Sequence, residues 1–275
     1  MILTYHISDV APYINWGYFF FAWQLKQEDE QRQMRREAEA FLSEIENRYR
    51  THAVFELMDA YAEGDDIVVS KAESGSSGRI ACLRQQAAGS EYLCLADYIL
   101  PKDCQASAEQ KALGSRVGLF ATSVDAGMEN DFKSDPYAKM MAQLLADRLA
   151  EATAERMHEE VRTRYWGYAP DEHLSMADLH LEHFQGIRPA VGYPSLPDAS
   201  LNFVLDSLLG MGHIGIRLTE NGAMRPHASV SGLMMAHSKA HYFSVGKIGA
   251  DQLADYARRR GIPVEMARRF LAANL

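Results

Sequence analysis

The sequence predicts an α+β fold formed by a single domain over residues 1–275. Segments typical of strands cluster in the first half and again near the C-terminus, and long amphipathic segments lie between them. No internal repeat and no long flexible linker divides the chain. This order, with strands grouped apart from helices, is typical of α+β domains rather than of alternating βα units.

The first half begins with a predicted helix at 26–51. Met34, Ala38, Leu42 and Ile45 recur there at spacings of three and four, which places them on one helical face. Short runs rich in β-branched and aromatic residues then predict strands, and SGSSG (Ser74–Gly78) predicts a turn. The predicted strands are 53–61, 66–70, 79–86, 92–100 and Val117–Val124. Residues 101–116 read as a surface loop.

The second half predicts mostly helices before a final group of strands. A long apolar stripe predicts a helix from Pro136 to Tyr165. Ser175 and Asp178 have capping-box spacing and predict the start of a helix that stops at Gly186. Further helices are predicted at 201–209, 251–260 and 263–275. Strands are predicted at 214–220, 228–237 and 240–248, the last two as a hairpin.

Composition narrows the class of protein. The formal charge is −9, which argues against nucleic acid as the main partner because phosphate binding needs a basic surface. No uncharged apolar stretch of about eighteen residues predicts a membrane span, and the first residues lack the features of a signal peptide. We therefore expect a cytoplasmic protein. Its cysteines form no CxxC pair and are expected to be buried apolar residues: Cys82, Cys94 and Cys104.

Two stretches resemble known binding motifs in their residue types, but their predicted structural context does not fit those motifs. GMGHIG (Gly210–Gly215) fits GxGxxG but lies between a predicted helix and a predicted strand, the reverse of a dinucleotide-binding turn. DLHLEHFQG (Asp178–Gly186) groups acidic and histidine residues, but helical spacing does not make them converge on a metal. We therefore expect a turn and a solvated helical face, and no metal site.

The segment GIRPAVGYPSLPD (Gly186–Asp198) can be neither a helix nor a central strand. Its three prolines fix backbone angles and reduce the entropy lost on ordering. Arg188, held in such a segment, can bind a carboxylate with two parallel hydrogen bonds. The composition leaves two interpretations open: a connector whose arginine pairs with a nearby glutamate, or one wall of a ligand site.

Within this segment, RPAVGYPSLP (Arg188–Pro197) fits the pattern RxxxGYxxxP. That motif resembles the S-adenosylmethionine-binding activation domain of cobalamin-dependent methionine synthase. Similar stretches extend along nearly the whole chain: INWGYFFFAWQL, LRQQ, CLADYILP, YWGYAPDE, LTENGAMRPHASVSG, HYFSVGKI and DQLADYARRRG. The resemblance implies a central, mostly antiparallel twisted sheet flanked by helices. We also expect that this chain is such a domain in the form of a stand-alone protein.

The resemblance implies a function in methionine biosynthesis. In that family the domain binds S-adenosylmethionine and docks over the cobalamin-carrying module. Its role is to bind and orient the methyl donor for the reductive methylation of cob(II)alamin, which restores the active synthase. The implied partners are the cobalamin-binding module of a methionine synthase in trans and a flavodoxin-like reductant. The implied ligands are S-adenosylmethionine and the cobalamin of the partner.

The resemblance implies a role in ligand binding for individual residues of this chain. Arg188 is expected to hold the carboxylate of the ligand. Tyr193 is expected near the reacting methyl group and is the catalytic candidate. Glu151 and Glu182 match acidic positions near the amino group. Backbone or ring contacts to the ligand are expected from Pro189, Ala190, Gly192, Tyr242 and Phe243. From the residues alone, Glu151 and Glu182 read as solvated helix charges and Tyr242 as an ordinary sheet residue.

Two departures from the family pattern leave alternatives open. Asn15 stands where the family has an aspartate near the amino group, so an acceptor oxygen is kept but the charge is lost. Residues 198–202 replace a segment that lies near the corrin ring in the family. These changes leave two possibilities open: a weaker donor site, or a site retuned for a partner in trans. The competing functions are a docking or regulatory module for a corrinoid protein without methyl donation, and an activator of a different corrinoid methyltransferase.

Overall fold

The chain is described by a computed structural model that covers residues 1–72, 75–86 and 91–275. Its centre is a six-stranded sheet in which every pair is antiparallel. The strand order is β4-β3-β2-β5-β8, and β1 pairs with the first residues of β2 on the same edge as β3. The strands are β1 (Ile2–Tyr5), β2 (Thr51–Glu63), β3 (Asp66–Lys71), β4 (Ser76–Ala81), β5 (Arg116–Val124) and β8 (Ser229–Met234).

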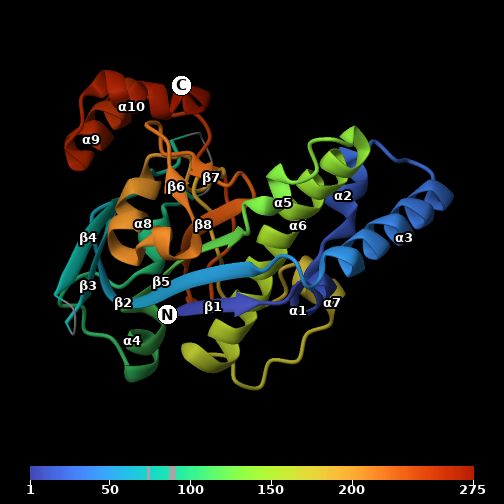
Figure 1. Cartoon of the computed structure of the whole chain (residues 1–275). Helices are drawn as coiled ribbons and strands as arrows, with labels where there is room; N and C mark the ends of the chain where they lie inside the picture. The colour runs from blue at the N-terminus through green and yellow to red at the C-terminus, as the bar shows by residue number, and fades with distance from the viewer. Residues whose placement is uncertain (73–74, 87–90) are drawn as a thin grey trace.

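Successive side chains of the two central strands, β2 and β5, pack alternately into two separate hydrophobic cores. Phe55 of β2 lies opposite Phe120 of β5, and both pack in the core that contains helix α6 (Pro136–Glu160). Val54 lies opposite Ala121, and both face the core beneath helix α8 (Leu201–Leu209). Because successive side chains point to opposite faces of a strand, an apolar run of this kind is buried on both sides. Figure 1 shows α8 over one face of the sheet and α6 behind the other.

Helix α6 has 25 residues and lines one side of the cavity described below. Pro136 occupies its first position, and the side chain of Asp135 accepts hydrogen bonds from the N–H groups of Tyr137 and Ala138. Both features stabilise a helix start. The helix runs on into a π-helical turn at Val161–Tyr165, where the N–H of Trp166 donates to the carbonyl of Val161 at 2.8 Å. The predicted helix from Pro136 to Tyr165 is confirmed.

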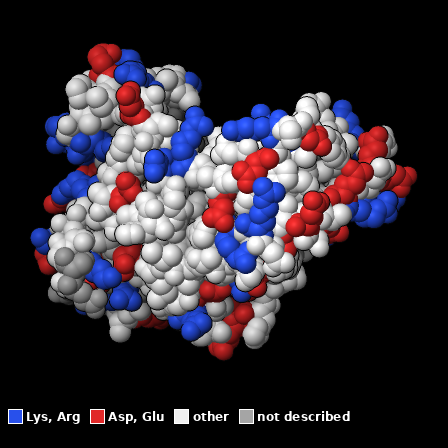
Figure 2. Space-filling view, viewed as in Figure 1, with Lys and Arg blue, Asp and Glu red and all other residues white. Residues whose placement is uncertain are grey.

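The other helices surround this centre. Helices α9 (Ala250–Arg260) and α10 (Val264–Phe270) cover a third, smaller core, at the end of the molecule opposite α3 (Glu28–Ile45) (Figure 1). Charges of both signs are mixed along α3, as its exposed face requires (Figure 2). The remaining elements are α1 (Ile7–Val10), α2 (Trp16–Ala22), α3 (Glu28–Ile45), α4 (Ala108–Gly114), α5 (Gly127–Asn130), α7 (Met176–His180), α9 (Ala250–Arg260), α10 (Val264–Phe270), β6 (Arg217–Leu218) and β7 (Met224–Arg225).

Several sequence predictions of elements were wrong. Residues 92–100 form a 3-10 turn at Leu95–Tyr98 rather than a strand, and residues 240–248 form no strand or hairpin. The strand predicted at 214–220 shrinks to the two residues of β6, and the helix predicted to reach Gly186 ends at His180. A short helix, α4, lies in the predicted loop at 101–116. The predicted turn at Ser74–Gly78 starts outside the described residues, and its last three residues belong to β4 rather than to a turn.

Two further predictions concern the burial of the cysteines and the presence of membrane-spanning helices. Cys82 and Cys94 are buried as expected, whereas Cys104 is exposed, which corrects the prediction for that residue. Within residues 1–72, 75–86 and 91–275, no helix combines the length and the apolar character needed to cross a membrane.

Candidate functional site

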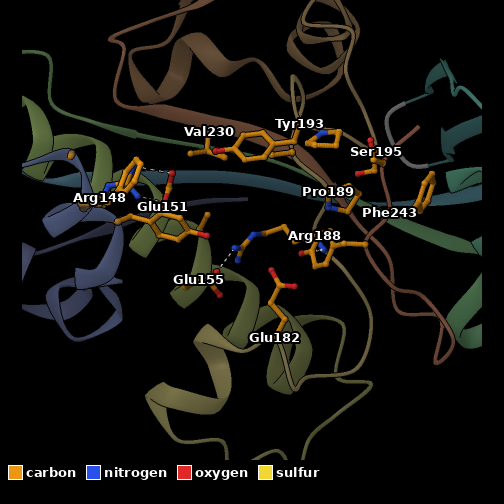
Figure 3. A pocket seen from close by; sticks show the side chains of 18 residues that line it. Arg148, Glu151, Glu155, Glu182, Arg188, Pro189, Tyr193, Ser195, Val230 and Phe243 are labelled. Atoms are coloured by element: carbon orange, nitrogen blue, oxygen red, sulfur yellow. Dashed lines mark hydrogen bonds and ion pairs between the residues drawn. The ribbon is translucent and has the colours of Figure 1, made fainter. Parts of the chain in front are cut away.

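A cavity of about 840 Å³ lies between α6, α2 and the segment after α7 (Figure 3). Its size falls within the range of small-molecule sites. Three glutamates and two arginines line it, so its lining carries a net negative charge. The lining residues are Tyr18, Phe21, Ala22, Arg148, Glu151, Ala154, Glu155, Glu182, Arg188, Pro189, Ala190, Tyr193, Pro194, Ser195, Val230, Tyr242, Phe243 and Ser244.

The proline-rich segment forms one wall because it runs along the free edge of β8. Ile187 and Met235 exchange both backbone hydrogen bonds at 2.9 Å, and the carbonyl of Pro189 accepts from the N–H of Leu233 at 3.0 Å. This approach is so close that a Cβ on Gly232 would lie 2.2 Å from the carbonyl oxygen of Pro189. A glycine is therefore required in β8 at this point.

A tight turn at 190–193 then projects Tyr193 toward the mouth of the cavity. The N–H of Tyr193 donates to the carbonyl of Ala190 at 3.2 Å, and Gly192, at the third position of the turn, has φ +88°. A positive φ at this position favours glycine. The Tyr193 side chain is half exposed, and burial of its hydroxyl end, followed by the charge of Glu151, raises the pKa of that hydroxyl.

Arg188 points into the cavity and forms an ion pair with Glu155 of α6. Burial opposes its charge, but the carboxylates of Glu155 and Glu182 and the hydroxyl of Tyr242 together outweigh this effect and raise the pKa of Arg188 above its usual range. The contact joins Nη2 to Oε1. Nη1 of Arg188 and Oε2 of Glu155 are both buried, and neither has a hydrogen-bond partner within the described part of the chain.

The backbone of Arg188 is fixed by Tyr242. The hydroxyl of Tyr242 accepts a hydrogen bond from the Arg188 N–H at 2.9 Å. This ties residues 242–244, which follow β8, to the start of the proline-rich segment. The two segments together form one corner of the cavity.

The other two glutamates of the cavity differ in their partners. Glu151 accepts hydrogen bonds from Arg148 at 2.7 and 3.2 Å, and Arg148 also lies 5.7 Å from the ring of Tyr18. Burial raises the pKa of Glu151, and Arg148 and then Arg188 oppose the shift. Glu182 lies at the rim with its carboxylate directed toward Arg188 (Figure 3). Partial loss of hydration raises the pKa of Glu182, and the charge of Glu155 adds to this.

A buried cluster behind the cavity holds the chain that carries Glu182. Arg162 is fully buried, contacts both oxygens of Glu172 at 2.6 and 2.9 Å, and stacks on Phe184 at 4.2 Å. It also donates to Nδ1 of His158 at 2.9 Å. Burial and the charge of Arg162 hold the pKa of His158 well below its usual value, so the imidazole is neutral. The cluster fastens residues 172–184 onto α6.

The structure brings together most of the residues predicted for the site. Glu151, Glu182, Arg188 and Tyr193 all line the cavity, as do Pro189, Ala190, Tyr242 and Phe243. Two predicted residues are not among the lining residues. Asn15 is the N-cap of α2, where its side chain accepts from the N–H of Gly17 at 3.1 Å, and Gly192 shapes the turn before Tyr193.

Comparisons with known proteins agree with this geometry. Residues 6–261 match the family described as vitamin B12 dependent methionine synthase, activation domain. The chain belongs to this family. It is also similar to the crystal structure of the MetH reactivation domain bound to AdoHcy, with a TM-score of 0.91 and 35% sequence identity. That match covers 100% of this chain and 90% of the other. The predicted family and the α+β fold with a mostly antiparallel sheet are confirmed.

Sequence reasoning missed several cavity residues of this activation domain. Glu155 lies four residues after Glu151 and Arg148 lies three before it, so helical spacing alone places all three on one face of α6. Tyr18 and Phe21 are likewise three apart on α2 and are 61% and 82% exposed. Large aromatic side chains this exposed at a cavity are typical of a binding surface. The helical spacing of these residues was the feature of the sequence that could have identified them as neighbours in the site.

Two further groups of residues discussed from the sequence, those at 198–202 and those of the DLHLEHFQG segment, make contacts within the protein. Asp198, Ser200 and Asn202 are buried rather than displayed on a docking surface. In the DLHLEHFQG segment, His183 contacts Asp178 at 3.1 Å and His180 contacts the carbonyl of Tyr13 at 3.1 Å. The two histidines therefore have separate partners, and Glu182 lines the cavity instead. No group of three potential metal ligands gathers among the residues that the structure describes.

Proposed function

We propose that this activation domain binds S-adenosylmethionine in the cavity and presents its methyl group to a cobalamin carried by a partner module. The observation that carries the proposal is Arg188, which lines the cavity and whose buried Nη1 has no partner among the described residues. A buried donor without an acceptor is costly, and a ligand carboxylate would satisfy it. The similar MetH reactivation domain was crystallised with AdoHcy, the demethylated form of this ligand.

Charge and shape support the same ligand. S-adenosylmethionine carries a carboxylate, an ammonium and a sulfonium, so its net charge is positive and complements the negative lining of the cavity. Pro189, Ala190 and Phe243 offer apolar and backbone contacts to the adenosine part. Tyr193, half exposed at the mouth, would stand beside the methyl group, and Tyr242 would hold Arg188 in place. Asn15 and Gly192 would act by shaping α2 and the turn.

The chemistry of methyl transfer would be supplied by the cobalamin when the partner is docked. The residues of this chain would bind the donor, orient its methyl group and exclude water around it. We further propose that the partner is the cobalamin-binding module of a methionine synthase acting in trans, in the cytoplasm, with a flavodoxin-like reductant supplying the electron. On this proposal residues 1–275 act as a single domain.

The first test is calorimetric titration of S-adenosylmethionine into the native protein and into Arg188→Ala. We expect binding by the native chain and a loss of at least about tenfold in the variant, because a charge-assisted contact is removed. A methylation assay with an added cobalamin module would follow. No binding by a folded native protein at millimolar ligand, with or without that module, would contradict the proposal and favour a docking module without methyl donation.

A further inference from the structure

The short ribbon formed by β6 and β7 carries two arginines in an unfavourable arrangement. Arg217 of β6 lies directly opposite Arg225 of β7 in the antiparallel register. Like charges placed directly opposite each other on neighbouring strands destabilise the pairing. Both residues are exposed, and neither forms an ion pair with a carboxylate in the part of the chain that the structure describes. The internal contacts of the fold therefore do not explain why two positive charges stand at these positions.

The alternation of the ribbon directs the two arginines away from the protein. Leu218 and Met224 form the next cross-strand pair and pack against the core beneath α8. Successive side chains point to opposite faces of a strand, so Arg217 and Arg225 lie on the outer face of the ribbon. The inner face is thus covered by packing, and the outer face presents two charges to its surroundings.

Arg269 of α10 extends the positive charge to the other end of the ribbon. It is exposed, and it donates to the side-chain oxygen of Asn221, in the turn between β6 and β7, at 3.3 Å. Its neighbour Arg268 pairs with Glu265, whereas Arg269 forms no ion pair with a described carboxylate. Glu220, in the same turn, is exposed and likewise unpaired within the described ranges. The three arginines therefore form a local positive surface on a chain whose formal charge is −9.

This positive surface lies close to the mouth of the cavity. His227, two residues after Arg225, contacts Asp147 of α6 at 3.3 Å. Met224 and His227 line a second hollow of about 230 Å³, which shares Tyr193 with the main cavity. Figure 1 places β6 and β7 beside the lobe of α9 and α10, and Figure 2 shows Lys and Arg side chains on both sides of the notch between this lobe and α5. A protein that covers the mouth would meet the ribbon at the rim of its contact.

We propose that Arg217, Arg225 and Arg269 form a contact surface for an acidic patch on the cobalamin-carrying partner. The inference rests on the proposed function and adds the chemistry by which that partner is recognised. Charged groups at the rim of an interface mainly steer the encounter and set its orientation. Such steering matters here because the net negative charge of the chain would otherwise repel an acidic partner.

The test measures the association rate of the cobalamin-loaded module of methionine synthase with three proteins. These are the native chain, the double variant Arg217→Glu with Arg225→Glu, and the control Arg32→Glu with Arg36→Glu. The control makes the same change of charge on exposed residues of α3, at the opposite end of the molecule. At about 50 mM salt we expect association about tenfold slower for the double variant and within about twofold of native for the control.

Salt and stability measurements show whether the loss is electrostatic. The difference between the native chain and the double variant should shrink at about 500 mM salt, because exposed charges are then screened. Two glutamates opposite each other repel as two arginines do, so thermal unfolding of the double variant should match that of the native chain. A loss of association that does not change with salt, or one of equal size in the control, overturns the inference.

Titration of S-adenosylmethionine separates this surface from the donor site. The affinity of the double variant should stay within about twofold of native, since none of the three arginines lines the cavity. Equal association rates of the double variant and the native chain would overturn the inference and leave the proposed function intact. Failure of the native chain to bind S-adenosylmethionine, or to bind the cobalamin module, would instead overturn the proposed function.

Discussion

Asp198 and Arg260 form a buried ion pair of 2.7 Å that joins the end of the proline-rich segment to helix α9. The side chain of Asp198 is 1% exposed, and it also accepts from the hydroxyl of Tyr256 at 2.7 Å. Its second oxygen accepts from the N–H of Ser200 at 2.8 Å. The carboxylate is therefore fully satisfied, and the C-terminal helices are fastened to the wall of the cavity.

Replacing Asp198 with alanine should lower the free energy of unfolding by about 3–5 kcal/mol. The substitution leaves Arg260 and Tyr256 buried without their acceptor, and breaking a buried pair costs this much. Chemical denaturation of the variant measures the loss. The matched control is Glu265→Ala, since Glu265 forms an exposed pair with Arg268 at 3.6 Å. The control should change stability by less than about 1 kcal/mol. Equal effects of the two variants would refute the anchoring role.

Replacing Gly192 with alanine should strain the turn without a clash. Gly192 has φ +88°, and a Cβ there would meet no atom within 4 Å. An L-residue in this region costs about 1–2 kcal/mol, so the turn should relax and displace Tyr193. Thermal unfolding and ligand titration should both report the change. Gly212→Ala is the control, because its Cβ also meets open space and its φ is not positive. An unchanged affinity in Gly192→Ala would show that the position of Tyr193 does not matter for binding.

The sequence predicted the elements whose periodicity is strong. The apolar stripe of α6 and the apolar runs of β2 and β5 were read correctly because α6 buries one face and the two strands are buried on both faces. The strands predicted at 92–100 and 240–248 are absent because the apolar residues there, among them Tyr98, Ile99, Val245 and Ile248, are buried in the core without strand pairing. A short apolar run indicates burial, but it does not show whether the backbone joins a sheet.

Without the family resemblance, the residues alone indicated a site only where one segment carries it. Arg188 and Tyr193 stand in a single rigid stretch, and the motif drew attention to both. The partner of Arg188 is Glu155, 33 residues earlier on α6, and nothing in the local sequence links them. Both interpretations of Arg188 hold in part: it pairs with a nearby glutamate and also lines a cavity. The ligand roles of the predicted residues stay predictions.

Replacing Tyr242 with phenylalanine should loosen Arg188 without removing it. The Arg188 N–H loses its acceptor, and an unsatisfied group of this kind costs about 1 kcal/mol. We expect S-adenosylmethionine to bind about three- to tenfold more weakly, measured by calorimetry. Tyr137→Phe is the control, because its hydroxyl bonds to Glu37 on the exposed surface away from the cavity. A loss of the same size in the control would assign the effect to general destabilisation.

Affinity for S-adenosylmethionine should fall as the pH is lowered from 7 to 5. The pKa values of Glu151 and Glu182 are both raised in the folded protein, chiefly by loss of hydration. These two groups therefore contribute stability that is present at low pH and lost as the pH rises through the folded pKa. The ligand has the opposite preference, because its cationic groups favour the ionised carboxylates. Binding should accordingly release protons near the raised pKa values.

Calorimetry at pH 7.5, 6.5 and 5.5, in buffers of different ionisation enthalpy, measures both the affinity and the proton release. The double variant Glu151→Gln with Glu182→Gln should bind more weakly at pH 7.5 and lose most of the pH dependence, since glutamine does not titrate. Arg188 stays charged throughout this range, so the carboxylate contact does not contribute to the slope. An affinity that stays constant or rises as the pH falls would show that neither glutamate faces the positive charge of the ligand.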